Sequence, residues 1–221
     1  MAMADPIRVV VVEDEELMRE LLATALSGWD AVEVVSAYGT GEEALLRLDA
    51  DRPDVALLDI DLGPGETGVH IGLRMRQWRS DVGIVLLSNY DEPGVLTALP
   101  RTEAFGWAYL LKKSVSRVAT IIRAIEGTRD RLVVVDPQLV HAMRPREHGR
   151  IASLTPRQRD ILRLIAEGYS NAGIAAELVI SAKSVENYVT QVYQGLGIDA
   201  AESFVHARVK ATLMFLEESG G

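Results

Sequence analysis

The apolar positions of the first 126 residues form two kinds of pattern that alternate along the chain. Short continuous apolar runs are typical of strands that are buried on both faces of a parallel sheet. They lie at 7–12, 55–60, 83–87 and 107–111, and a further strand is predicted around 32–37. Between them, apolar residues recur at the three- and four-residue spacing of amphipathic helices. Helices are predicted at about 17–28, 40–50, 69–78 and 115–126, with one more that ends near Pro100.

Five repeats of strand and helix predict an α/β fold. Right-handed crossovers between consecutive strands give a (βα)5 doubly wound parallel sheet with helices on both faces. Thr40, followed three residues later by Glu43, forms a capping-box sequence at the start of the second helix.

Residues after 152 show helical patterns and no strand. Thr155, Pro156 and Gln158 predict a helix start with a capping box, and Ser170 and Ser181 are predicted caps of the next two helices. Two short helices joined by a tight turn form a helix-turn-helix, whose second helix enters the major groove of DNA. With helices predicted at 182–196 and about 201–215, this part is a small all-α, four-helix helix-turn-helix domain.

The stretch between these two patterns changes character. Residues 132–143, LVVVDPQLVHAM, favour a short strand and a helix, whereas 144–150, RPREHGR, is polar and lacks periodicity, as expected of a linker. The predicted organisation is therefore a first domain at 1–128, a linker at 129–152 and a helix-turn-helix domain at 153–221.

Composition limits the class of protein. The chain is 48% hydrophobic and 25% charged, and no apolar run approaches the ~18 residues of a membrane span. The first eight residues lack the apolar core of a signal peptide. The chain has no cysteine, which excludes disulfides, thiolate zinc sites and cysteine nucleophiles. We expect a cytoplasmic protein with no membrane partner.

Polar side chains follow four of the predicted strands at the point where each strand ends. Glu13 and Asp14 follow the first strand, Asp59 the third, Ser88 the fourth and Lys112 the fifth. The carboxyl ends of parallel strands meet at one edge of the sheet, so these side chains are expected to converge. Clustered carboxylates without thiols or imidazoles suit Mg²⁺, and a lysine and a hydroxyl beside them suit a phosphoryl group.

Residues 7–127 resemble the receiver domain of two-component response regulators. The polar residues at the strand ends match that family in order and approximate spacing. The resemblance implies that Asp59 accepts a phosphoryl group from a phosphohistidine on a sensor histidine kinase. It further implies that Glu13 and Asp14 hold Mg²⁺ together with Asp59 and the backbone carbonyl of Asp61. The loop after Asp59, DLGPGETG, is one residue longer than is usual in the family.

The resemblance also implies a switch. Lys112 would pair with Asp59 and then with its phosphate, and Ser88 would swing toward the phosphate oxygens. Tyr109 resembles the aromatic residue that rotates inward to fill the space that Ser88 leaves; the alternative is an ordinary half-buried strand residue. The segment between Ser88 and Lys112 is about two residues longer than in the family.

The C-terminal helices resemble the LuxR/NarL-type DNA-binding domain through the matches LTPR, LIAEG, SN, IA, L and IS with SVENYV. By this resemblance the fourth helix is a dimerisation element. The alternative is a helix that only packs within the domain and needs no partner. The predicted DNA-binding residues lie at the start of and along the third helix. They are Ser181, Lys183, Ser184, Glu186, Asn187 and Thr190.

The recognition helix is poorer in basic residues than the family pattern. Glu186 and Thr190 stand where lysine is common in the family, and residues 150–221 carry 7 Lys and Arg against 8 Asp and Glu. Basic side chains supply most non-specific affinity for DNA, so binding is expected to be weak or strongly dependent on dimerisation. The helix can still recognise bases. Asn187 can pair with adenine, Glu186 can accept a hydrogen bond from cytosine, and Thr190 can contact a thymine methyl group. The alternative is that these are solvated helix positions.

The main interpretation is a phosphorylation-controlled transcription regulator and not an enzyme. Its partners would be a sensor histidine kinase and promoter DNA, with a homodimer as the phosphorylated form. One alternative is a receiver-regulated protein-interaction module with weak or lost DNA binding. A second is a phosphatase that works through an aspartyl phosphate, with Asp61 as general acid. The attached helix-turn-helix argues against the phosphatase.

Overall fold

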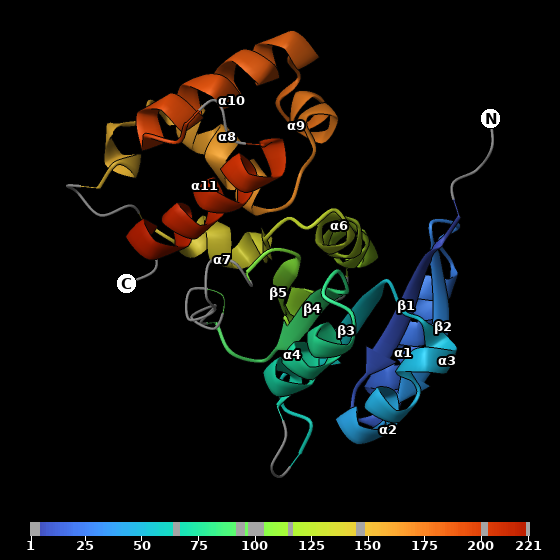
Figure 1. The fold of residues 1–221 in the computed structure, drawn as a ribbon. Coiled ribbons are helices and arrows are strands. Elements are labelled where there is room, and N and C mark those ends of the chain that lie inside the picture. The colour runs from blue at the N-terminus through green and yellow to red at the C-terminus, as the bar shows by residue number, and fades with distance from the viewer. Residues whose placement is uncertain are drawn as a thin grey trace. The chain divides into compact units, whose positions relative to one another are not determined.

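The computed structural model describes residues 5–63, 67–91, 96, 104–114, 117–144, 149–199 and 203–219. The chain divides into two compact units, and Figure 1 colours it from blue at the N-terminus to red at the C-terminus. The sheet unit comprises Met1–Asp91 and Gly106–Arg131, and the helical unit comprises Glu92–Phe105 and Leu132–Gly221.

The sheet unit holds five parallel strands in the order β2-β1-β3-β4-β5. They are β1 (Ile7–Val12), β2 (Val32–Tyr38), β3 (Val55–Asp59), β4 (Gly83–Ser88) and β5 (Trp107–Leu111). Every residue of β3, β4 and β5 is buried, as the continuous apolar runs predict. The chain order reverses between β1 and β3, and the carboxyl ends of strands beside such a reversal form a crevice. The predicted α/β doubly wound sheet is confirmed.

Helices cover both faces of this sheet (Figure 1). They are α1 (Glu16–Ser27), α2 (Gly41–Leu46), α3 (Leu48–Asp51), α4 (Gly68–Trp78) and α6 (Val118–Arg129). Helix α1 packs with α6, and α2 packs with α4. The apolar side of α6 buries Ile121, Ile122 and Ile125, as its helical spacing predicts.

Two predicted helices differ from those in the structure. The helix predicted at 40–50 is divided into α2 and α3 at Arg47, whose ψ of 0° departs from the helix. The side chain of Asp51 accepts hydrogen bonds from Tyr38 at 2.6 Å and Ser36 at 3.2 Å, and these contacts with β2 hold α3 in its own direction. The last helix of the unit begins at Val118, because the backbone of Arg117, with φ −105° and ψ 85°, is not helical. Lys112–Ser114 form a 3₁₀ turn. The helix predicted to end near Pro100 lies outside the described residues, apart from Leu96.

The helical unit contains the four predicted C-terminal helices and three elements that lie or begin in the predicted linker. These are β6 (Val134–Val135), α7 (Pro137–Ala142), the 3₁₀ turn η2 (Ile151–Ser153), α8 (Pro156–Ala166), α9 (Asn171–Leu178), α10 (Ala182–Leu196) and α11 (Phe204–Ser219). Helix α8 packs against α10 and α11, and α10 packs against α9. The short strand and helix expected in 132–143 are present, and α7 packs against α8.

Side-chain caps start the helices of the helix-turn-helix where the sequence predicts. Thr155 and Gln158 form the complete capping box of α8. Ser170 accepts from the backbone N–H of Gly173 at 3.1 Å, and Ser181 accepts from that of Ser184 at 3.1 Å. Each cap satisfies a backbone donor that the helix itself leaves unpaired, and so fixes the residue at which the helix begins.

The turn between α9 and α10 contains a residue in an unfavourable conformation. Val179 has φ 53° and ψ 50° and is 89% exposed. A β-branched residue in the left-handed region crowds its own backbone, and exposure leaves little packing to compensate. Val179→Gly is therefore expected to stabilise the protein by about 1 kcal/mol, measured by denaturant unfolding. Val179→Ala, which keeps the Cβ atom, should gain less; an equal gain would contradict the explanation.

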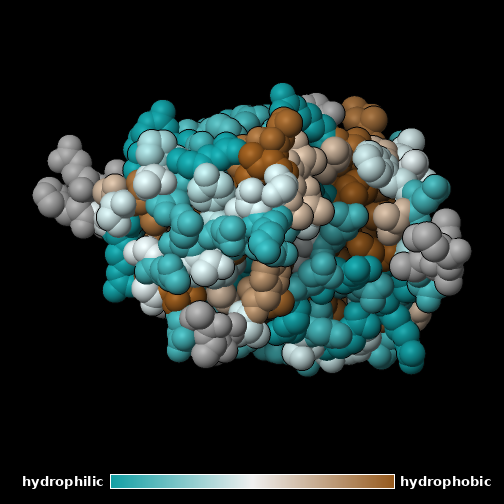
Figure 2. All heavy atoms as spheres, turned by 90° about the horizontal axis from the view of Figure 1, so that it is seen from above, coloured by the Kyte–Doolittle hydropathy of each residue, from teal (hydrophilic) through white to brown (hydrophobic). Residues whose placement is uncertain are grey.

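Large hydrophobic side chains are exposed at only a few described positions. They are Leu17, Leu21, Trp29, Leu46, Tyr90, Val179 and Phe204. The face in Figure 2 is mostly hydrophilic, with smaller hydrophobic areas between. Across the described part of the chain, no helix has both the length and the apolar character needed to cross a membrane.

Candidate functional site

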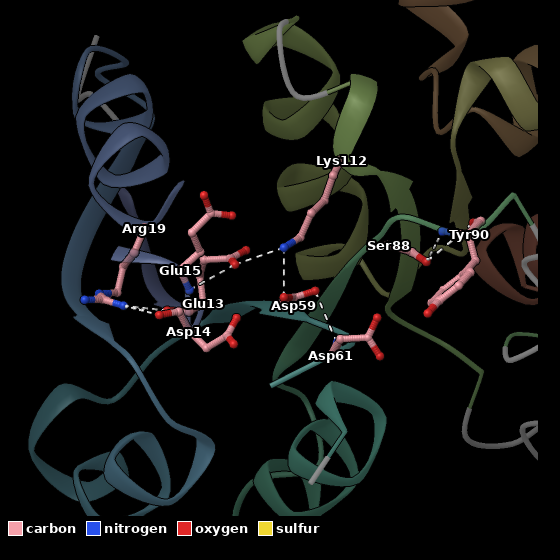
Figure 3. A network of polar contacts seen from close by, with 9 residues as sticks. All are labelled: Glu13, Asp14, Glu15, Arg19, Asp59, Asp61, Ser88, Tyr90 and Lys112. Atoms are coloured by element: carbon pink, nitrogen blue, oxygen red, sulfur yellow. Dashed lines mark hydrogen bonds and ion pairs between the residues drawn. The ribbon is translucent and has the colours of Figure 1, made fainter. Parts of the chain in front are cut away.

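The structure brings together three carboxylates from the ends of β1 and β3. Carboxylate oxygens of Glu13, Asp14 and Asp59 lie within 4.8 Å of one another. Glu13 is completely buried, Asp59 is 3% exposed, and Asp14 is exposed at the rim. Figure 3 shows the three side chains converging with Lys112, as their positions at the strand ends predict. A nearby cation stabilises such a cluster of negative charges.

Lys112 supplies a positive charge from the residue that follows β5. Its Nζ donates to Asp59 Oδ2 at 2.8 Å and to Glu13 Oε1 at 2.9 Å. Burial by itself would lower the pKa of Lys112, but its hydrogen bonds to Asp59 and Glu13 and their charges outweigh it, so the pKa is raised. Lys112 is therefore a fixed cation at neutral pH, bridging two acids from different strands.

Glu13 has the least favourable environment of the three acids. Burial raises its pKa, the hydrogen bond from Lys112 acts in the opposite direction, and the charge of Asp59 raises the pKa further. Its Oε2 is buried and has no hydrogen-bond partner among the described residues. A buried carboxylate oxygen of this kind is costly to leave unpaired. The arrangement offers a position for a further cation.

Asp61 stands at the rim of the cluster. Its backbone N–H donates to Asp59 Oδ1 at 3.2 Å, and its side chain is exposed. Asp61 also forms a single antiparallel bridge with Thr67, which closes the base of the loop 61–67. The sequence predicts Asp61 as a contributor to this site, and the structure ties its backbone directly to Asp59.

Ser88, at the end of β4, is linked to the ring of Tyr109. Tyr109 is 2% exposed, and its hydroxyl lies 2.7 Å from Ser88 Oγ and 2.8 Å from the carbonyl of Tyr90. Ser88 Oγ also accepts from the backbone N–H of Tyr90 at 2.9 Å. The ring is thus buried, where half-burial was the alternative expectation. Any movement of Ser88 must break its bond to Tyr109.

Two residues important for the geometry are missing from the sequence-based prediction. Arg19 donates to backbone carbonyls of the loop that carries Glu13 and Asp14. Gly68, at the start of α4, lies so close to β3 that an added Cβ would be 2.1 Å from the Asp59 carbonyl oxygen. The position of Gly68 directly after a loop was an available signal. Arg19 has none, because an arginine in the first turns of an amphipathic helix is usually a surface residue.

Helix α10 presents the predicted DNA-binding residues on its exposed side. Val185, Val189, Val192 and Leu196 are buried, and the side chains of Lys183, Glu186, Asn187 and Thr190 are exposed. The Thr190 hydroxyl donates to the Glu186 carbonyl at 2.9 Å, and the hydroxyls of Ser181 and Ser184 lie 2.8 Å apart in the helix cap. The two serines thus have a structural role at the start of the helix.

Known families match both parts of the chain. Residues 9–126 match the family described as "Response regulator receiver domain", and residues 152–214 match "Bacterial regulatory proteins, luxR family". The chain is a response regulator of the LuxR family. It is 32% identical over 214 residues to the "Probable transcriptional regulatory protein NarL" of Mycobacterium tuberculosis (strain ATCC 25618 / H37Rv), covering 95% of this chain and 97% of that protein.

Other similar proteins agree with this family. The "Oxygen regulatory protein NreC" of Staphylococcus carnosus is 28% identical over 223 residues, covering 94% of this response regulator and 99% of the relative. The solved "Structure of two RcsB dimers bound to two parallel DNAs" matches with a TM-score of 0.51 and 18% identity, over 94% of this chain and 98% of that one. That structure supports the fold alone.

Family membership decides between the functions left open by the sequence. The response regulator is a phosphorylation-controlled transcription regulator with a LuxR-type DNA-binding domain, and it is not a phosphatase. The match to the luxR family covers α8, α9 and α10 and most of α11, which favours DNA binding over a role in protein interaction alone.

Proposed function

We propose that Asp59 is the phosphoacceptor of this response regulator and that a sensor histidine kinase is the donor. The observation that carries the proposal is the placement of Lys112 Nζ at 2.8 Å from the Asp59 carboxylate. An Asp59 oxygen attacks phosphorus, an O–P bond forms, and the N–P bond to the donor histidine breaks. Lys112 is already in place to balance the negative charge of the transferring group.

We assign Mg²⁺ as the cation of the site, held by Glu13, Asp14, Asp59 and the backbone carbonyl of Asp61. The residues fit the ion: the donors are oxygens only, the three carboxylates converge, and Glu13 Oε2 is buried without a hydrogen-bond partner among the described residues. When bound, Mg²⁺ supplies positive charge that balances the phosphoryl oxygens.

The switch follows from the hydrogen bonds around Ser88. When Ser88 turns toward phosphate oxygens on Asp59, it gives up its contact with the Tyr109 hydroxyl. Tyr109 is held by β5, whose last residue directly precedes Lys112. Phosphorylation thus changes the partners of Ser88, Tyr109 and Lys112 together, and this biases the surface between two states.

Phosphorylation of the full chain tests the assignment of Asp59. Incubation with acetyl phosphate and Mg²⁺ is expected to add one phosphoryl group to the wild type and none to Asp59→Asn, measured by intact-protein mass spectrometry. Asp61→Asn is the matched control, because it alters an exposed carboxylate and retains the proposed backbone ligand. Phosphorylation of Asp59→Asn, or its loss in Asp61→Asn alone, would place the acceptor elsewhere.

We further propose that the phosphorylated regulator binds promoter DNA as a homodimer and acts in the cytoplasm. Exposed side chains of α10 are the proposed DNA contacts, with Lys183 near a phosphate and Asn187 near a base edge. A dimer places two recognition helices on neighbouring half-sites and compensates for the few basic residues on each helix.

A salt series tests this interface. Because a homodimer carries each substitution twice, the steepness with which log affinity falls against log salt, for the promoter of its own gene, is expected to decrease by about two in Lys183→Met and to increase by about two in Glu186→Lys. Gel-shift titration with a beryllofluoride phosphate mimic measures both. Asp59→Ala, which is expected not to respond to the mimic, serves as the control. Unchanged slopes in both α10 variants would exclude this helix face from the DNA interface.

A further inference from the structure

Arg19 holds the loop that carries two of the three clustered acids. Its Nη1 donates to the backbone carbonyl of Glu13 at 2.7 Å and to that of Asp14 at 3.3 Å. Within the described residues, its guanidinium donates to these carbonyls and to no carboxylate. In Figure 3 the backbone of Glu13 and Asp14 lies between Arg19 and Asp59. The arginine therefore acts on the loop from behind the cluster.

The loop is also fixed by its neighbours on either side. The backbone N–H of Glu13 donates to the Tyr38 carbonyl at 3.1 Å, and the N–H of Arg19 donates to the Glu15 carbonyl at 2.9 Å. A Cβ atom on Gly39 would lie 3.4 Å from Arg19 Nη1, so the guanidinium packs closely over the loop after β2. These contacts place the guanidinium where it can define the orientation of the two peptide planes.

Repulsion between the carboxylates explains why the hydrogen bonds from Arg19 to the loop are useful. The oxygens of the three carboxylates lie within 4.8 Å of one another, and their repulsion favours movement of Glu13 and Asp14 away from Asp59. Charge-assisted hydrogen bonds from a guanidinium to two successive carbonyls oppose that movement. Because Arg19 binds backbone oxygens, it adds positive charge near the cluster and leaves the carboxylate oxygens available to a metal ion.

Lys112 differs from Arg19 in this respect. Its Nζ occupies one oxygen each of Glu13 and Asp59, which are also proposed metal ligands. We propose that Arg19 is a positioning residue that presets Glu13 and Asp14 for a divalent cation through its two carbonyl hydrogen bonds. This inference rests on the proposed function, in that it takes Mg²⁺ as the cation.

Binding of Mg²⁺ alone to the full chain, measured by isothermal titration calorimetry, tests the proposal. Arg19→Met, which keeps the apolar stem, is expected to bind Mg²⁺ about 10-fold more weakly than the wild type. Arg19→Lys should recover only part of this loss, because the shorter side chain does not carry its ammonium group to the position of Nη1, the single atom that donates to both carbonyls. Arg129→Met is the matched control: it removes an exposed arginine from α6 and should bind Mg²⁺ as the wild type does.

Phosphorylation by acetyl phosphate separates positioning from general damage. The Mg²⁺ concentration that gives half the maximal rate should rise about 10-fold in Arg19→Met, while the rate at saturating Mg²⁺ should equal that of the wild type. If Arg19→Met does not fold, Arg19→Gln, with a single amide donor group, serves in its place.

The outcomes distinguish this inference from the proposed function. Failure of the wild type to bind Mg²⁺ overturns the metal assignment itself. Wild-type binding with an unchanged affinity in Arg19→Met overturns the role of Arg19 alone. Full recovery in Arg19→Lys also overturns it, because charge without the paired carbonyl bonds would then suffice.

Discussion

Lys112→Met is expected to destabilise the sheet unit by about 3 kcal/mol in Mg²⁺-free buffer near pH 8. The Lys112 ammonium group forms ion pairs with both Asp59 and Glu13, and the side chain of Glu13 is 0% exposed. Removing one partner of a buried ion pair leaves the other charge without compensation, and this costs more than the pair itself contributes. Chemical denaturation followed by circular dichroism measures the change.

The loss of stability in Lys112→Met should decrease at lower pH and on addition of Mg²⁺. Burial already raises the pKa of Glu13, and removing Lys112 takes away an opposing effect. The folded protein then holds a proton on Glu13 more tightly than the unfolded chain does, so the destabilisation should shrink as the pH falls toward about 5. Added Mg²⁺ should also restore part of the stability, because it binds the folded state.

Lys113→Met provides the control for this prediction. Lys113 pairs with Asp91 at 2.9 Å, but these side chains are 53% and 64% exposed. An exposed ion pair contributes about 0–1 kcal/mol, so this variant should unfold nearly as the wild type does. Equal stability of the two variants at pH 8 without Mg²⁺ would show that the bridge to Glu13 does not hold the sheet edge together.

The strands β3, β4 and β5 could be predicted because each is buried on both faces. A segment such as 55–59 must then be continuously apolar, and its acidic last residue stands out. The parallel order brings the strand ends to one edge, which is why Glu13, Asp59 and Lys112 could be placed together from the sequence. Helix boundaries were less accurate, because contacts from other elements set them: Asp51 is held by β2 through Tyr38.

The supporting contacts of the site could not be predicted in the same way. Arg19 acts through backbone carbonyls, and a hydrogen bond to a carbonyl places no demand on the identity of the residue that carries it. Nor did the sequence predict that the Tyr109 hydroxyl bonds to Ser88. That contact depends on the side-chain conformation of a strand residue, which apolar periodicity does not report.

Gly68→Ala is expected to destabilise the protein by about 3 kcal/mol and to prevent phosphorylation of Asp59. An added Cβ would lie 2.1 Å from the Asp59 carbonyl oxygen and 2.9 Å from its carbonyl carbon. Both contacts are with backbone, so no side-chain rotation relieves them. The start of α4 must move away from the end of β3, and the hydrogen bond from Gly68 N–H to the Ile60 carbonyl, 3.0 Å long, must break.

The same displacement connects stability to function, since Asp59 is the last residue of β3 and belongs to the backbone that must shift. Denaturant unfolding measures the first effect and acetyl phosphate labelling the second. Gly28→Ala is the control, because a Cβ there meets only the Ala25 carbonyl at 3.6 Å, an ordinary contact, and Gly28 has φ −78°. If Gly68→Ala were as stable and as readily phosphorylated as Gly28→Ala, close approach of α4 to β3 would not be what positions the phosphoacceptor.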